Sequence, residues 1–417
     1  MTSVELTSPS SVERPENRLL WLLGPAFVAA IAYVDPGNVA ANLSAGAEYG
    51  YLLVWVLVVA NAMAVIVQYL SAKLGLVTGK SLPEVLGERM PRVGRLLYWA
   101  QAELVVAATD LAEVIGGAIA LQILFDLPLL LGGVIVGVVS MGILGVQNRN
   151  GQRPFEFVVM ALLAIITVGF VAGLVVSPVS WSETAAGLVP RFEGSRTVLL
   201  AASMLGATVM PHAIYLHSSL SRDRHGVQTE PIRIQRLLTA TRWDVGVALV
   251  IAGSVNIAML LLAAASLPGV AGTDTIGGAH MAIENALGPA IGVTFGIGLL
   301  ASGLASTSVG CYAGATIMKG LLHVRISLLV RRAVTLIPAL IILAVGFDPT
   351  MALVLSQVFL SIGIPFALIP LIWLTSRRNL MGQFVNGIPM RVSAFVVTAA
   401  IVALNVLLIF LTITGQD

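Results

Sequence analysis

The chain has 417 residues, of which 57% are hydrophobic and only 11% charged, and its mean hydropathy is +0.95. Soluble domains carry about 25% charged residues, so this composition excludes a soluble globular protein and predicts a membrane protein with many spans. The formal net charge of +2 gives no case for a nucleic-acid partner, and the single cysteine, Cys311, excludes an intramolecular disulfide.

The first 17 residues are polar and lack the basic and then apolar pattern of a cleaved signal peptide. We therefore expect residues 1–17 to form a short disordered tail. A helix that crosses the hydrocarbon core needs about 20 mostly apolar residues, and eleven later segments meet this requirement. These predicted transmembrane helices cover residues 19–45, 51–75, 95–125, 128–147, 155–177, 197–221, 240–267, 289–321, 328–347, 350–375 and 390–414.

The basic residues are distributed very unevenly between the two sides of the predicted membrane. If the N-terminus is cytoplasmic, all of the 23 Lys and Arg residues except Arg191 and Arg196 lie in cytoplasmic loops or at the cytoplasmic ends of spans. This distribution agrees with the positive-inside rule. One span too many or too few in the prediction would destroy this agreement. We therefore expect a multi-pass protein of the inner (plasma) membrane, with a cytoplasmic N-terminus and the C-terminus outside.

Two predicted spans are interrupted by helix breakers. The first contains AYVDPGNVAANLSA (32–45) and the sixth contains LLAASMLGATVMPHAIYLHSSL (199–220), which places Pro36 and Pro211 175 residues apart. Five spans begin with each segment, and an odd number of spans per unit reverses the direction of the second copy. The pattern predicts an all-α inverted repeat with broken first and sixth helices.

The predicted repeat divides the chain into three parts after the tail. Residues 18–177 form the first five-helix repeat and residues 197–376 form the second, inverted one. Residues 388–417 add the eleventh helix and a short outer tail.

The breakers predict unwound backbone in the middle of the membrane. A proline removes one backbone donor and clashes with the preceding turn, and the adjacent Gly37 relaxes the chain further. Unpaired backbone groups are too costly in lipid, so each break must face protein or a watery cavity. One alternative is a proline kink that merely bends the helix. Two breaks at matched positions, both with polar side chains, favour a substrate site.

The side chains at the breaks have the chemistry of metal ligands. Asp35 offers an anionic oxygen, Asn38 an amide oxygen and Met210 a thioether, and the carbonyls of Ala32 and Ala207 lie one turn before the two breaks. Mixed oxygen and sulfur donors suit Mn²⁺, Fe²⁺, Co²⁺ or Cd²⁺, whereas Mg²⁺ and Ca²⁺ do not prefer a thioether. The alternative for Met210 is a core residue that fills a gap.

At this point the motifs resemble a known family. DPGN (35–38) and MPH (210–212) look like the two signature motifs of the Nramp family of proton-coupled divalent metal transporters, whose bacterial members mainly import manganese. The resemblance covers the whole chain and implies a LeuT-like fold, with a 5+5 inverted repeat and one extra helix. It places the family's metal ligands on Asp35, Asn38 and Met210 and on the carbonyls of Ala32 and Ala207. Magnesium-selective relatives depart from the pattern at the methionine, which this chain keeps.

Two lone amides within the spans are open to two interpretations. The resemblance suggests that Gln357, in the tenth span, adds an oxygen ligand in one conformation, but a hydrogen bond between helices explains it equally well. Asn256, in the seventh span, is similar. The small residues at 302–316 in the eighth span predict close helix packing rather than a site.

The third span carries three acids on one helix face, within QAELVVAATDLAEVIGGAIAL (101–121). Acids inside the membrane are costly and usually face the protein interior. Histidines in the sixth span can also carry protons. The residues concerned are Glu103, Asp110 and Glu113, with Arg331 and Arg332 as the expected basic partners, and His212 and His217.

The resemblance assigns roles to these groups. Asp35 would bind both metal and proton, Asp110 and Glu113 would accept protons, and Glu103 with Arg331 or Arg332 would line the exit. The alternative is a fixed ion-pair network that only holds helices together.

These observations predict a secondary transporter that imports Mn²⁺, and also Fe²⁺, Co²⁺ or Cd²⁺, together with protons by alternating access. The chain has no nucleotide loop, zinc-ligand cluster or nucleophile elbow, so we expect no enzyme activity and no cofactor. The expected partners are the metal, protons and the bilayer, without an obligate protein partner, which is compatible with a monomer. The alternative is a sodium-coupled symporter of an organic substrate on the same scaffold. A metal-sensing receptor would need a signalling domain, for which the loops and tails are too short.

Overall fold

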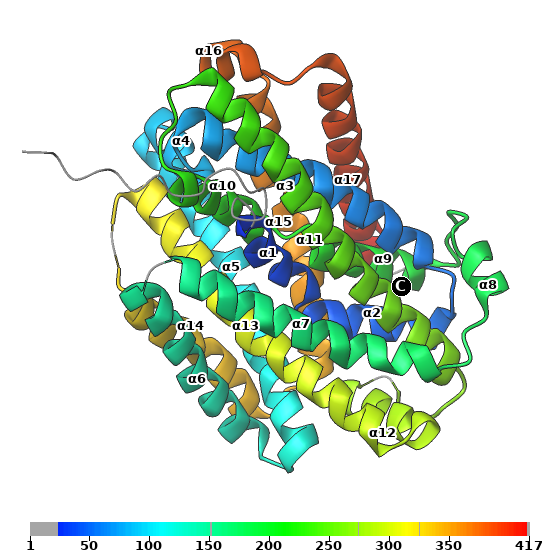
Figure 1. The fold of residues 1–417 in the computed structure, drawn as a ribbon. Helices are drawn as coiled ribbons and strands as arrows, with labels where there is room; N and C mark the ends of the chain where they lie inside the picture. The colour runs from blue at the N-terminus through cyan, green and yellow to red at the C-terminus, as the bar shows by residue number, and fades with distance from the viewer. Residues whose placement is uncertain (1–23, 151, 274, 325, 415–417) are drawn as a thin grey trace, which may run out of the picture.

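The computed structural model describes residues 24–150, 152–273, 275–324 and 326–414, so the predicted tails at 1–17 and 415–417 lie outside the described residues. The described part of the chain folds into α-helices with two short 3₁₀ turns (Figure 1). In chain order these are α1 (Pro25–Ile31), η2 (Ala32–Val34), α2 (Pro36–Tyr49), α3 (Val54–Thr78), α4 (Leu82–Arg89), α5 (Arg92–Phe125), α6 (Leu129–Asn150), α7 (Gln152–Val176), α8 (Trp181–Ala186), α9 (Ser195–Thr208), α10 (Pro211–His225), α11 (Pro231–Ser266), α12 (Ile276–Leu287), α13 (Pro289–Leu322), α14 (Leu328–Val345), α15 (Pro349–Thr375), α16 (Arg378–Met381), η3 (Gly382–Phe384) and α17 (Ile388–Thr414).

Each of the eleven predicted spans corresponds to helix in the structure. The first span is α1, η2 and α2, the sixth is α9 and α10, and the other nine are single helices. Within the described residues, nine helical segments are long and apolar enough to cross a membrane, and the shorter apolar segments Pro25–Val34 and Leu129–Gly145 belong to the first and fourth spans. The predicted boundaries were least accurate at α11, which begins nine residues before the predicted start at 240.

Four short α-helices lie in the connections within the described residues, where none was predicted. They are α4, α8, α12 and α16. The α4 helix has a local cause, because Ser81 and Glu84 form a capping box at its start, with a proline in its first turn. Such short helices give no hydropathy signal, so a search for membrane spans does not detect them.

The contacts between helices come in matched pairs that follow the two halves of the chain. The α10 helix packs on α3, just as α2 packs on α11, and α15 packs on α5, just as α7 packs on α13. If each of the first five spans is exchanged with the corresponding span of the second five, each contact becomes the other contact of its pair. This is the arrangement that an inverted repeat requires, although the boundaries at 18–177 and 197–376 remain predictions.

The broken helices occupy the middle of the bundle. Figure 1 shows α1 and α2 at the centre, with α6 and α14 at one edge and α17 at another. Almost the whole of α9 and α10 is buried, whereas α7, α14 and α17 expose most of their length. The exposed helices face the bilayer, and the breaks are covered by protein, as backbone without helical hydrogen bonds requires.

Candidate functional site

The first break is formed by Asp35 and the proline that follows it. Asp35 is extended (φ −71°, ψ 168°) and is the N-cap of α2, because its Oδ1 accepts a 2.8 Å hydrogen bond from the backbone N–H of Asn38. Pro36 occupies the first helical position, where its missing donor costs nothing. The sequence therefore stops η2 and restarts α2 within one residue.

The carbonyls freed by this break are bound by neighbouring helices. Asn256 Nδ2 donates to the Tyr33 carbonyl at 2.6 Å, and Ser302 Oγ donates to the Val34 carbonyl at 2.6 Å. Asn42 in turn donates to Asn256 Oδ1 at 2.9 Å. Asn256 thus makes the helix-to-helix hydrogen bonds that were one of its two interpretations, and it supports the unwound backbone.

The second break joins the first through a side-chain amide. Met210 is extended (φ −74°, ψ 124°) before Pro211, which begins α10. Asn38 Nδ2 donates both to Asp35 Oδ1 at 2.6 Å and to the Ala207 carbonyl of α9 at 2.9 Å. One amide therefore holds together the two interrupted helices that the sequence placed 175 residues apart.

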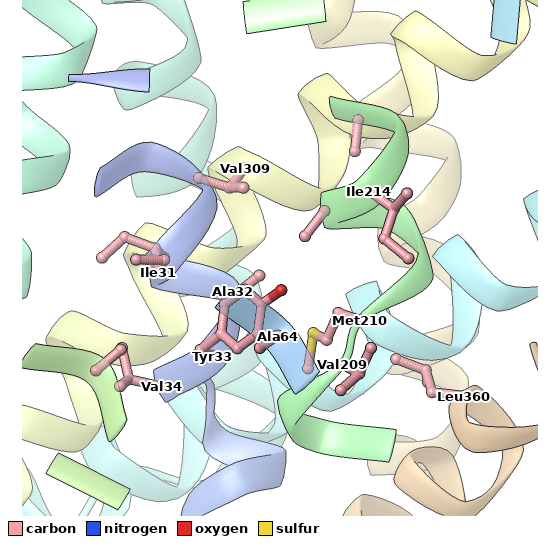
Figure 2. Close-up of a cluster of buried hydrophobic side chains, with 14 of the residues drawn as sticks. Ile31, Ala32, Tyr33, Val34, Ala64, Val209, Met210, Ile214, Val309 and Leu360 are labelled. Atoms are coloured by element: carbon pink, nitrogen blue, oxygen red, sulfur yellow. The ribbon is translucent and has the colours of Figure 1, made fainter. Parts of the chain in front are cut away.

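Met210 lies in the protein interior rather than toward lipid. Its side chain is fully buried, in the same cluster as Ala32, Tyr33 and Val34 of the first break. Figure 2 shows Met210 and Val209 on the stretch between α9 and α10, with the residues of the first break in the same view. Ala32 begins the short turn η2 and is equally buried.

Three oxygens at this place are buried without a hydrogen-bond partner among the described residues. They are Asp35 Oδ2, Asn38 Oδ1 and Gln357 Oε1. Gln357 lies directly against the first break, since a Cβ built on Gly37 would lie 1.7 Å from its Nε2. Buried polar atoms without partners are few in native proteins. Oxygens of this kind beside a thioether form a donor set that a dehydrated transition-metal ion would satisfy.

The acids of α5 form two ion pairs with the start of α14. Arg331 donates two hydrogen bonds, of 2.6 and 3.2 Å, to the carboxylate of Glu103. Arg332, which is fully buried, pairs with Asp110 and donates from Nε to Ser140 Oγ at 2.8 Å. The sequence left open which arginine faces Glu103, and the structure assigns Arg331 to it.

Of the three acids of α5, Glu113 is the one that forms no ion pair in the described part of the chain. It is fully buried, and neither carboxylate oxygen has a hydrogen-bond partner there. It faces α13, where a Cβ on Gly310 would lie 3.0 Å from its Oε2. A Cβ on Gly303 would likewise lie 2.9 Å from the backbone of Gly117. The small residues of the eighth span thus allow the close packing that was predicted.

The two histidines of α10 lie in different networks. His212 Nδ1 is 3.4 Å from Thr109 Oγ1 on α5, beside Asp110. His217 Nδ1 is 2.8 Å from Gln68 Oε1, and Gln68 Nε2 donates to the Tyr33 hydroxyl at 2.6 Å. The second network runs from α10 through α3 back to the first break.

Sequence reasoning missed several residues of these networks. Gln68 was detectable as an amide side chain inside an apolar span, because such residues usually face the protein interior. Thr109, Ser140 and Ser302 gave no signal, because serine and threonine are common in membrane helices, where their hydroxyls can bond their own backbone. Tyr33 gave no signal either.

The chain matches a known family and its solved members. It matches the Nramp family, described as natural resistance-associated macrophage protein-like, over residues 26–411. It is 60% identical over 395 residues to the divalent metal cation transporter MntH of Mycobacterium tuberculosis (strain ATCC 25618 / H37Rv), covering 95% of this chain and 92% of that protein. The structure of the Eremococcus coleocola manganese transporter with an aromatic bis-isothiourea substituted compound is similar at a TM-score of 0.85 and 30% identity, covering 99% of this chain and 90% of that one.

A more distant likeness concerns the fold alone. The structure of MhsT in complex with L-phenylalanine matches at a TM-score of 0.65 and 15% identity, covering 92% of this chain and 98% of that one. The predicted fold class, a LeuT-like inverted repeat with an added helix, is therefore confirmed. Because both the family match and the identity to MntH extend over nearly the whole chain, the chain belongs to the Nramp family.

Proposed function

We propose that this chain imports divalent transition metals, Mn²⁺ first among them and also Fe²⁺, Co²⁺ or Cd²⁺, by alternating access coupled to protons. The observation that carries the proposal is the meeting of the two breaks, where Asn38 bridges Asp35 and Ala207. Around this bridge lie the thioether of Met210 and buried oxygens that have no hydrogen-bond partner among the described residues. The relatives described above are a divalent metal cation transporter and a manganese transporter, which agrees with this chemistry.

The proposed ligands are Asp35, Asn38 and Met210, the carbonyls of Ala32 and Ala207, and Gln357 in one conformation. In the present conformation the Asn38 amide donates to Asp35 Oδ1 and to the Ala207 carbonyl. A cation must displace this amide group before it can use the same two oxygens. Turning the amide over would then present its oxygen to the metal. The metal is the transported substrate here, and we expect no resident cofactor.

For the proton we propose a path from Asp35 to Glu113 and on to the paired acids of α5. Glu113 is buried without an ion pair in the described structure, so it is best placed to take up a proton. Asp110 with Arg332, and then Glu103 with Arg331, continue along α5 and α14. Glu103 is the most exposed of the three acids, with 23% of its side chain accessible, as an exit group should be. His212 and His217 remain candidates for proton transfer beside this path.

The decisive experiment is uptake into proteoliposomes that contain the purified chain, with Mn²⁺, Fe²⁺, Mg²⁺ and Ca²⁺ offered separately while internal pH is followed. We expect uptake of Mn²⁺ and Fe²⁺ with internal acidification and no uptake of Mg²⁺ or Ca²⁺. Uptake that requires Na⁺ and an organic substrate instead would favour the alternative symporter.

Asp35→Asn is the sharpest variant for this assay. Asparagine caps helices as well as aspartate does, so α2 should persist while the anionic ligand is lost. We expect Mn²⁺ uptake to vanish while the amount of folded protein stays the same. Retained uptake would exclude the site as proposed.

A further inference from the structure

The tenth span, α15, contains two internal prolines, Pro365 and Pro370. A proline has no backbone N–H, so each of them leaves the carbonyl four residues earlier without its helical hydrogen bond. The two carbonyls belong to Ser361 and Phe366. An unpaired carbonyl is costly inside a membrane, so each of the two needs a donor from another part of the chain.

At Pro365 the donor is Asn405 of α17. Its Nδ2 donates to the Ser361 carbonyl at 2.9 Å, and its Oδ1 accepts a 2.8 Å hydrogen bond from Ser361 Oγ. Ser361 is fully buried and only 5% of Asn405 is exposed. The amide therefore replaces the backbone donor that the proline lacks and forms a second bond with the same residue.

The second proline of α15 has the same arrangement. The Phe366 carbonyl, which Pro370 leaves free, accepts a 2.5 Å hydrogen bond from the hydroxyl of Tyr98 on α5. At both prolines, a side chain from another span takes the place of the missing N–H. The prolines thus fix α15 to its neighbours instead of only bending it.

The turn of α15 that Asn405 holds belongs to the proposed metal site. Gln357, a proposed ligand, lies one turn before Ser361 on the same face of the helix. A Cβ built on Gly206 of α9 would lie 2.2 Å from the Gln357 carbonyl and 3.0 Å from the backbone nitrogen of Ser361. Residues 357–361 therefore lie between α9 on one side and Asn405 on another.

We propose that Asn405 is a positioning residue for metal transport, because it replaces the hydrogen bond lost at Pro365 and holds residues 357–361 of α15 against α9. Gln357 is thereby kept beside the first break. This inference rests on the proposed function of the chain. It gives a role to α17, which lies at an edge of the bundle and outside the two repeats (Figure 1).

The kinetics of Mn²⁺ uptake by the purified full chain in proteoliposomes test the proposal. Asn405→Leu keeps similar bulk and removes both hydrogen bonds, and Ser361→Ala removes one of them. We expect KM for Mn²⁺ to rise about tenfold in Asn405→Leu and about threefold in Ser361→Ala, as hydrogen bonds between membrane helices contribute. The maximal rate per folded protein should change little, because binding and not movement is weakened.

A rescue experiment separates positioning from general stability. Pro365→Ala restores the backbone N–H to α15, so Asn405→Leu should no longer raise KM when it is combined with Pro365→Ala. Thr398→Val is the matched control, since it removes a hydroxyl of α17 that bonds the Ala394 carbonyl of its own helix. That control should keep the KM of the wild type.

Two results would overturn the proposal while the wild type still imports Mn²⁺. One is a lower maximal rate with unchanged KM in both Asn405→Leu and Ser361→Ala, because Asn405 would then only hold α17 in place. The other is a raised KM that Pro365→Ala does not rescue. Absence of Mn²⁺ uptake by the wild type itself would instead refute the proposed function, and this role of Asn405 with it.

Discussion

At the scale of single residues, the proposed metal site combines atoms that no single helix brings together. Asp35 and Asn38 come from the start of α2, and Met210 and the Ala207 carbonyl come from the second break. A thioether among oxygens distinguishes soft from hard cations because Ca²⁺ and Mg²⁺ take oxygen ligands almost exclusively. Selectivity should therefore depend on the sulfur, and capture of the cation on the carboxylate.

Met210→Ala is expected to let Ca²⁺ and Mg²⁺ compete with Mn²⁺, because the ligand that disfavours hard ions is removed. The measurement is inhibition of Mn²⁺ uptake by Ca²⁺ in proteoliposomes. Met204→Ala is the matched control, since Met204 is an equally buried methionine of α9 that packs in a different cluster. Both variants lose a core side chain at a cost of about 2–5 kcal/mol. Unchanged selectivity in Met210→Ala would mean that the sulfur does not filter the ions.

Glu113→Gln is expected to reduce metal-evoked proton flux more than metal binding. The substitution preserves the size of the side chain and removes the titratable group. Because Glu113 forms no ion pair in the described residues, its replacement breaks none and should leave the helix packing intact. Metal binding by calorimetry and internal pH in the uptake assay separate the two effects. Glu183→Gln, on the exposed helix α8, should change neither quantity. Normal proton flux in Glu113→Gln would refute the proposed relay.

At the scale of helices, the proposed metal site is expected to depend on close approach between the broken segments and their neighbours. Gly206 of α9 faces α15 so closely that an added Cβ would lie 2.2 Å from the Gln357 carbonyl. Gly116 of α5 faces Pro36 in the same way, at 2.0 Å from the proline Cβ. Each of these contacts lies within one repeat, and the glycine lets a neighbouring span approach the broken helix of that repeat closely.

Gly206→Ala is expected to push α9 away from α15 and to reduce Mn²⁺ uptake strongly. Overpacking of this kind costs about 1–3 kcal/mol. Gly246→Ala, within α11, is the matched control because no atom lies within 4 Å of an added Cβ there. That control should keep full uptake and gain slightly in thermal stability, since alanine is the better helix former. Equal uptake by both variants would show that the approach of α9 to α15 is not needed.

At the scale of the whole molecule, charge decides the orientation that we propose. Nearly all Lys and Arg residues lie on one side of the spans, and Lys80 and Arg222 are among those at the end of the bundle where α4 lies. The α8 connection joins α7 to α9, at the ends of the spans opposite to the ends that α4 connects. The positive-inside rule then places α4 in the cytoplasm and α8 outside.

Cysteine labelling in intact cells checks this orientation. Glu183→Cys, on α8, should react with a membrane-impermeant maleimide in intact cells, whereas Lys80→Cys should react only after permeabilisation. The native Cys311 is buried and should stay unlabelled in both variants, which makes the wild type the control. The surface pair of Lys80 with Glu88 contributes little to stability, so its loss should not disturb the fold. Labelling in the reverse order would invert the proposed topology.

The sequence by itself determined the eleven spans, the two breaks and the residues proposed as ligands. Hydropathy and helix breakers are local properties, and a bilayer enforces them because an unpaired backbone group cannot remain in lipid. The tertiary structure alone decided which arginine faces which acid, that Asn38 bridges the two breaks, and that Asn256 and Ser302 bind the freed carbonyls. Those contacts join residues more than 160 positions apart in the chain, and helix packing sets such distances through side-chain shapes that no local pattern encodes.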